Sequence, residues 1–181
     1  MKVKQIASGG ILAGVVFSGG WVFYPAGHLL PIPGGKFLAM TPYLAFAMAV
    51  ALDRIRSPWT ITIIAVAMAA VASLFTPLMS VAIVCSGLAA DLTGHLLPGS
   101  LSSVTRRSLW SASFSFWGFW SFVGVSLYLT QNPIYDVLQP SHLLTMGAFV
   151  GVISWMGGRF GVAFSNRIRS TIQSNSEGPQ S

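Results

Sequence analysis

Residues 37–75 read FLAMTPYLAFAMAVALDRIRSPWTITIIAVAMAAVASLF. Two apolar runs, residues 37–52 and 59–75, flank a charged turn that ends in Ser57-Pro58. Each run approaches the length of about 20 residues that a helix needs to cross the hydrocarbon core of a bilayer. The stretch therefore predicts two membrane helices joined by a tight turn.

The composition of the whole chain favours the same class of protein. Of its 181 residues, 53% are hydrophobic and 8% are charged, whereas a soluble domain has about 25% charged residues. Four more apolar runs, residues 6–24, 78–97, 109–129 and 141–164, complete the pattern. We therefore expect an all-α polytopic membrane protein with six transmembrane helices in one domain, residues 1–169, and a disordered polar tail, residues 170–181. Six spans leave no room for a soluble catalytic head, a nucleotide-binding domain or a nucleic-acid-binding module.

The basic residues predict the orientation of these six helices. The net charge is +6, and nine of the ten Lys and Arg residues fall on one side of the six-span map. Only Lys36, at the end of a loop rich in Pro and Gly, falls on the other side. Basic residues accumulate on the cytoplasmic side of membrane proteins, so both termini are expected in the cytoplasm of a multi-pass plasma-membrane protein.

Small residues recur at helical spacing in the first span, in the pairs Gly9/Ala13 and Gly10/Gly14. Such pairs allow another helix to approach closely. The other helix belongs either to the same chain or to a partner protein, and the sequence leaves both open.

Asp91 and His95 lie four residues apart in the fourth span and so share one helix face. An ionisable residue inside a membrane is costly and normally faces a cavity or a partner group. Asp91 is therefore expected either to contact a ligand or ion, or to tie helices together through a pair with His95.

Aromatic residues crowd the fifth span, where Trp117 and Trp120 fall in the middle rather than at the membrane interface. Aromatic walls suit a flat or cationic organic ligand, although lipid contact and helix packing also use such residues. His142 opens the sixth span and Trp155 lies deeper in it. Metal-binding motifs and phosphate-binding glycine loops are absent from the sequence, so no cofactor is expected.

From the second to the fourth span the sequence resembles the substrate-capture (S) subunits of energy-coupling factor (ECF) transporters, and among them the thiamine/hydroxymethylpyrimidine type. The resemblance covers about half of the chain. It rests on Tyr43, the turn Arg56-Ser57-Pro58, Pro77 ahead of Ile83, and Gly87-Leu88-Ala89-Ala90-Asp91. The first helix of the family usually carries Ala-x-x-x-Ala, for which this sequence has Gly9-x-x-x-Ala13.

The resemblance implies a non-catalytic subunit that captures a vitamin or vitamin precursor, thiamine-like or otherwise aromatic, at the outer face. It implies docking through the first helix, at Gly9, Gly10, Ala13 and Gly14, on a transmembrane T subunit that works with two cytoplasmic ATPases. The expected ligand contacts are Lys36, Ser86, Asp91, Trp117, Trp120, His142 and Trp155.

Two other interpretations stay open. Rhomboid-type intramembrane proteases also have six spans, with a serine in the fourth and a histidine in the sixth, and Ser86 and His142 would be the nucleophile and base. Val84 stands where that family's Gly-x-Ser-Gly motif has its first glycine. The other possibility is a small transporter or assembly factor of no assigned family.

Overall fold

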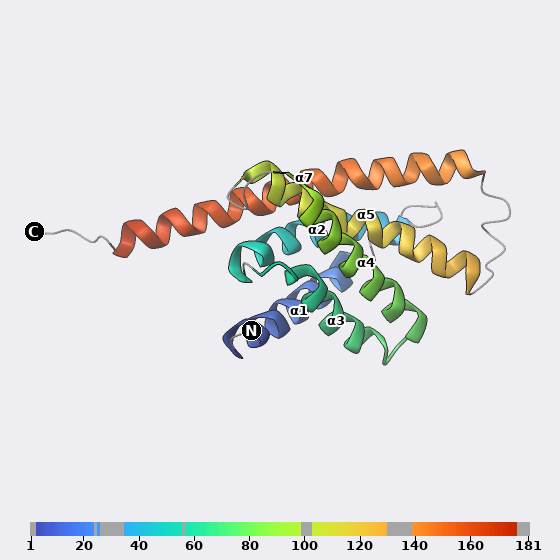
Figure 1. Cartoon of the computed structure of the whole chain (residues 1–181), viewed down its shortest axis with the longest axis horizontal. Coiled ribbons are helices and arrows are strands. Elements are labelled where there is room, and N and C mark those ends of the chain that lie inside the picture. The colour runs from blue at the N-terminus through green and yellow to red at the C-terminus, as the bar shows by residue number, and fades with distance from the viewer. Residues whose placement is uncertain are drawn as a thin grey trace, which may run out of the picture.

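A computed structural model describes residues 3–23, 25, 35–55, 57–98, 103–129 and 139–176. The regular structure in these residues is helical throughout, which confirms the all-α prediction. The described residues form these helices, in chain order (Figure 1): α1 (Val3–Phe23), α2 (Gly35–Ile55), α3 (Thr60–Ala72), α4 (Pro77–Leu96), α5 (Val104–Tyr128) and α7 (Pro140–Ser176).

Three of the described helices contain segments that are long and apolar enough to cross a membrane, namely Phe37–Ile55, Pro77–Leu96 and Pro140–Thr171. Gly10–Gly20 and Thr60–Ala72 are apolar but shorter. Six transmembrane helices with both termini in the cytoplasm therefore remain a prediction.

The helix boundaries follow from local chemistry. Thr60 begins α3, and its hydroxyl donates to the Ser57 carbonyl at 2.8 Å while accepting from the Ser57 N–H at 3.1 Å. Pro77 opens α4, where its missing N–H removes no helical hydrogen bond. At the other end of the chain, α7 continues to Ser176 and so enters the tail for which composition predicted disorder. Hydroxyls of Ser170 and Thr171 bond the Arg167 carbonyl within this extension.

Helix α5 lies against α2, α4 and α7, and this position explains its many serines. The hydroxyls of Ser111 and Ser113 donate to carbonyls of their own helix, at 3.0 and 2.6 Å. The hydroxyl of Ser115 donates across to the Thr41 carbonyl of α2 at 3.3 Å. Because each hydroxyl has a partner, these serines can be buried at little cost.

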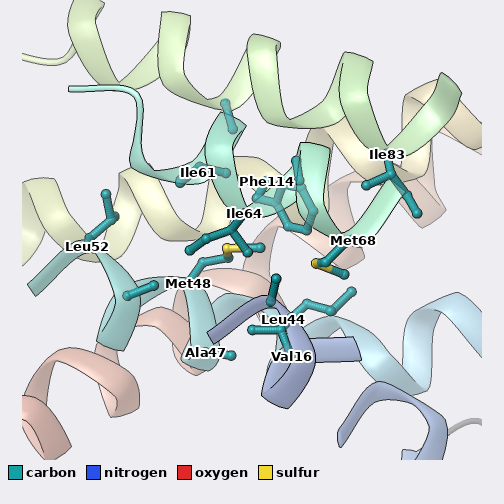
Figure 2. Close-up of a cluster of buried hydrophobic side chains, with 14 of the residues drawn as sticks. Val16, Leu44, Ala47, Met48, Leu52, Ile61, Ile64, Met68, Ile83 and Phe114 are labelled. Atoms are coloured by element: carbon teal, nitrogen blue, oxygen red, sulfur yellow. The ribbon is translucent and has the colours of Figure 1, made fainter. Parts of the chain in front are cut away.

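A hydrophobic core fills the space between α1, α2, α3, α4 and α5 (Figure 2). Its labelled members come from all five helices: Val16, Leu44, Ala47, Met48, Leu52, Ile61, Ile64, Met68, Ile83 and Phe114. Tyr43 of α2 contacts α1 beside this core. Its hydroxyl donates to the Val15 carbonyl of α1 at 2.8 Å, and its ring occupies the space beside Gly19 of α1.

Glycines bring α7 into backbone contact with its neighbours. A Cβ at Gly157 would strike the carbonyl and Cα of Pro42 in α2, and one at Gly161 would lie 2.5 Å from the Phe46 carbonyl. A Cβ at Gly158 would lie 2.7 Å from the Ser108 carbonyl of α5. The pair Gly157/Gly161 is thus a small-xxx-small contact within the chain.

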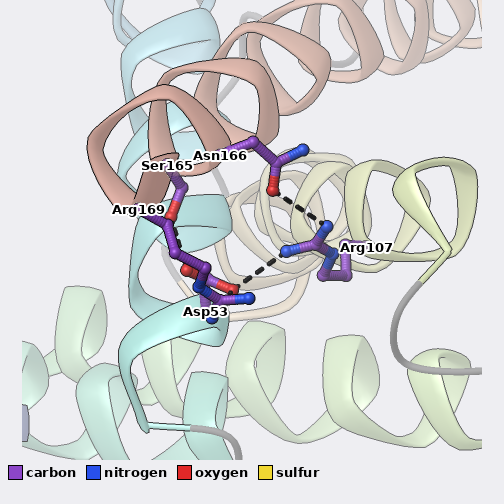
Figure 3. A network of polar contacts seen from close by, with 5 residues as sticks. All are labelled: Asp53, Arg107, Ser165, Asn166 and Arg169. Atoms are coloured by element: carbon purple, nitrogen blue, oxygen red, sulfur yellow. Dashed lines mark hydrogen bonds and ion pairs between the residues drawn. The ribbon is translucent and has the colours of Figure 1, made fainter. Parts of the chain in front are cut away.

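One carboxylate joins three helices at the end of the bundle that carries Arg54, Arg106 and Arg107, which we call the arginine end (Figure 3). Asp53 of α2 accepts from Arg107 of α5 at 3.0 Å and from Arg169 of α7 at 3.1 Å. The Ser165 hydroxyl donates to the same carboxylate at 2.7 Å. We call the opposite end, where α2 begins and α5 ends, the neutral end.

The contact between α7 and α2 predicts that Gly157→Ala destabilises the protein. The added methyl group would meet the backbone at Pro42, which cannot move aside as a side chain can, so we expect a loss of about 1–3 kcal/mol. The measurement is thermal unfolding in detergent, followed by tryptophan fluorescence. Gly124→Ala is the control, because no described atom lies within 4 Å of its Cβ. Equal melting temperatures for the two variants would contradict the prediction.

Candidate functional site

Aromatic side chains gather at the neutral end, around the second half of α5. Phe119, Val123 and Val150 are buried there, and further apolar side chains from α2, α5 and α7 pack on them: Phe37, Leu38, Trp120, Leu127, Leu143 and Met146. Phe119 and Trp120 meet edge to face at 5.4 Å between ring centroids. This cluster is the part of the described structure best suited to an organic ring.

The two tryptophans expected to form one ligand wall face different helices. Trp120 packs on α7, where a Cβ at Gly147 would lie 2.8 Å from its ring. Trp117 instead donates its indole N–H to the Thr93 hydroxyl of α4 at 2.8 Å and is 37% exposed. Of the pair, only Trp120 belongs to the aromatic cluster.

Ser86 lies on α4 beside the cluster and is 1% exposed. Its hydroxyl donates to the Ala82 carbonyl at 2.5 Å, one turn earlier in the same helix. Gly118 of α5 lies next to it, since a Cβ built on Gly118 would be 3.8 Å from the Ser86 Oγ and 2.9 Å from the ring of Phe37. Phe37 and Gly118 were not among the residues expected from the sequence. Gly118 lies within the aromatic run of α5, whereas no sequence pattern distinguishes Phe37 of α2.

Asp91 lies away from the cluster and is fully buried. Its carboxylate accepts from the backbone N–H of Thr62 in α3 at 2.7 Å and from the indole N–H of Trp110 in α5 at 3.1 Å. His95 does not pair with this carboxylate; one ring nitrogen lies 2.6 Å from the Asp91 carbonyl, and the ring packs 5.1 Å from that of Trp59. The geometry matches the helix-tying alternative, with Thr62 and Trp110 as partners in place of the expected histidine.

The remaining expected ligand residues are dispersed. His142 is exposed in the first turn of α7. Trp155 is also at the surface, with the Arg159 guanidinium 5.1 Å from its ring centroid. The side chain of Lys36 lies outside the described part of the structure. The structure therefore brings Ser86 and Trp120 to the cluster, but not Trp117, Asp91 or Trp155.

The small residues of α1 face two directions. Ala13 is buried against the bundle. Gly10 and Gly14 face outward, with no described atom within 4 Å of a Cβ built on either. Exposed apolar residues surround them, among them Ile11 at 71% and Val22 at 75% exposure. Gly9 falls where side-chain surroundings are not described. The Gly10/Gly14 pair is thus available to a helix of another protein.

The buried position of Asp91 predicts that Asp91→Ala destabilises the bundle strongly. Two donors from α3 and α5 would lose their acceptor, at a cost of about 1–3 kcal/mol each. Asp91→Asn retains one acceptor oxygen and should be milder. Melting temperatures in detergent measure both. A D91A protein that melts like wild type but no longer binds a small molecule would instead make Asp91 a ligand residue.

No family model matches the chain, and no curated protein matches its sequence. Among solved structures, the chain is similar to one described as an S-component of an ECF transporter. The two share 22% sequence identity and a TM-score of 0.60, over 94% of this chain and 87% of the other. At this identity the likeness establishes the architecture, while function depends on the site. The chain therefore has the fold of an S-component.

Proposed function

We propose that this protein is the substrate-capture subunit of an ECF-type importer in the plasma membrane. The observation that carries the proposal is the fold shared with an S-component over 94% of the chain. On this proposal the chain is not an enzyme. It binds a small molecule, docks on a transmembrane T subunit, and depends on two cytoplasmic ATPases for energy.

The distribution of charge supports an orientation for this subunit. Arg107 and Arg169 meet Asp53 at the arginine end (Figure 3). Arg54, Arg106 and Arg167 lie within two residues of these three along the chain. Since arginines favour the cytoplasmic side, we place this end and both termini in the cytoplasm. The neutral end, with its aromatic cluster, then faces outward and receives the substrate.

The character of the cluster supports an aromatic vitamin or precursor, such as thiamine or its pyrimidine. Trp120 and Ser86 are the expected residues that lie at the cluster, and they are our first candidates for ligand contact. Lys36 and His142 belong to the starts of α2 and α7 at the same end, so we retain them. Asp91, Trp117 and Trp155 are retained only as candidates to be tested, because their described contacts lie elsewhere.

The contacts of Ser86 do not favour the protease interpretation. A nucleophilic serine needs a base within hydrogen-bond reach and access for its substrate. The Ser86 hydroxyl is buried and donates to a backbone carbonyl, whereas His142 is exposed in the first turn of α7.

The outward face of α1 predicts the docking site on the T subunit. Gly14→Leu places a large side chain where a partner helix would approach, so we expect at least a tenfold loss of the T subunit and ATPases that co-purify with the tagged protein. The control is Gly124→Leu, since Gly124 of α5 also has open space around its Cβ. Co-purification that falls equally in both variants, or in neither, would reject α1 as the docking helix.

The substrate is identified most directly by mass spectrometry of small molecules released from the purified protein. A bound aromatic vitamin is the expected result, whereas a fluorophosphonate probe that labels Ser86 would favour the protease instead.

The aromatic cluster predicts that Trp120→Ala weakens ligand binding by more than tenfold, because its ring packs at the cluster. Trp117→Ala should change affinity by less than about threefold, because Trp117 faces Thr93 of α4 instead. Isothermal titration calorimetry with thiamine and its pyrimidine measures both. A larger effect at Trp117 would move the ligand to the side of α5 that faces α4.

A further inference from the structure

The ring of Phe37 in α2 packs directly on Gly118 in the middle of α5, and this close approach requires glycine at position 118. A Cβ built on Gly118 would lie 2.9 Å from Cζ of Phe37, 3.4 Å from Cε2 of that ring and 3.8 Å from Oγ of Ser86. The ring of Phe37 therefore occupies space that any side chain at position 118 would fill. We call this position, which the chain's own aromatic ring fills, the slot.

The surroundings of the ring define which chemistry the slot accepts. Phe37 packs against Phe122 at 5.5 Å and against Phe119 at 6.5 Å between centroids, with interplanar angles of 55° and 47°. The Ser86 hydroxyl is the polar group described at the slot. Aromatic walls and a neutral hydroxyl suit a flat, uncharged ring, and they offer no described counter-ion to a charged one.

The helix that carries Phe37 contains a proline five residues further on. Pro42 lies inside α2 and has no N–H to donate to the Leu38 carbonyl, so the helix is weakened one turn after Phe37. On the far side of the proline, Asp53 holds α2 to α5 and α7 through two ion pairs. Residues 35–41 therefore lie on the other side of the proline from these ion pairs.

We propose that Phe37 is an internal plug of a ring-binding slot formed by Ser86, Gly118, Phe119 and Phe122. Its ring leaves the slot when the flat, uncharged aromatic ring of a substrate enters, and residues 35–41 move about Pro42 as it does so. The inference rests on the proposed function, since it names the part of the substrate that the capture subunit holds.

The plug can be tested without knowing the substrate, through the reactivity of a cysteine at position 86. Cys85 is the sole cysteine of the chain, so Cys85→Ala removes all other thiols, and Ser86→Cys then provides one buried thiol. N-ethylmaleimide, which has a flat uncharged ring, is the probe. We expect Phe37→Ala to accelerate its reaction with this thiol at least tenfold, and Gly118→Ala added to Phe37→Ala to slow it again by refilling the slot.

Leu38→Ala is the matched control, because Leu38 is the next residue of the same turn and packs in the same cluster. Labelling that is unchanged by Phe37→Ala, or accelerated equally by Leu38→Ala, overturns the plug. Circular dichroism and melting temperature exclude variants that have lost the fold.

Binding experiments separate this inference from the proposed function. If the wild type binds thiamine or its pyrimidine, Gly118→Ala should weaken binding at least tenfold, and Phe37→Ala should strengthen it severalfold because no plug is displaced. If the wild type binds the ligand and Gly118→Ala does not change its affinity, the slot is rejected and the proposed transport function is retained. Accelerated labelling in a protein that neither binds a vitamin nor recruits a T subunit supports the plug and overturns the transporter.

Discussion

The bundle depends on the close contact of α7 with α2, in which glycines replace side chains. Gly157 and Gly161 lie on the backbone at Pro42 and Phe46, and Gly158 lies on that at Ser108 of α5. Apolar side chains gain little by leaving lipid for protein, so helices in a membrane associate through close packing and polar contacts. The same approach brings Ser165 and Arg169 of α7 to Asp53.

Two carboxylates add polar contacts between the helices, one of them partly buried and the other fully buried. Asp53 connects α2, α5 and α7 at the arginine end, while Asp91 connects α4 to α3 and α5. Each accepts hydrogen bonds from donors on other helices, as a carboxyl group removed from water requires. The neutral end has no comparable ionic fastening among its described residues. Its cohesion comes from aromatic and aliphatic packing.

The sequence predicts the helical class and most helix positions, because long apolar runs broken by Pro and charge permit few other structures. It predicts less of the site. Trp117 and Trp120 are three residues apart, which predicts one shared wall, yet Trp117 meets Thr93 and Trp120 meets Gly147. The helix that each face of α5 contacts depends on how α5 is rotated about its own axis. Because α5 is buried on several sides, its pattern of apolar and polar residues does not define this rotation. For the same reason, the sequence does not predict that Gly157 and Gly161 contact the backbone of α2.

The length of α7 has a mechanical consequence. A helix of 37 residues is about 55 Å long, well beyond the roughly 30 Å of the hydrocarbon core. Arg169, near the C-terminal end of α7, forms an ion pair with Asp53 of α2. Helix α7 therefore turns with the bundle and not independently of it. In Figure 1 its last turns project past the other helices. When the protein tilts in the bilayer, Ser176 is therefore displaced further than the rest of the bundle. A spectroscopic label at Ser176 would report the tilt angle of the whole molecule.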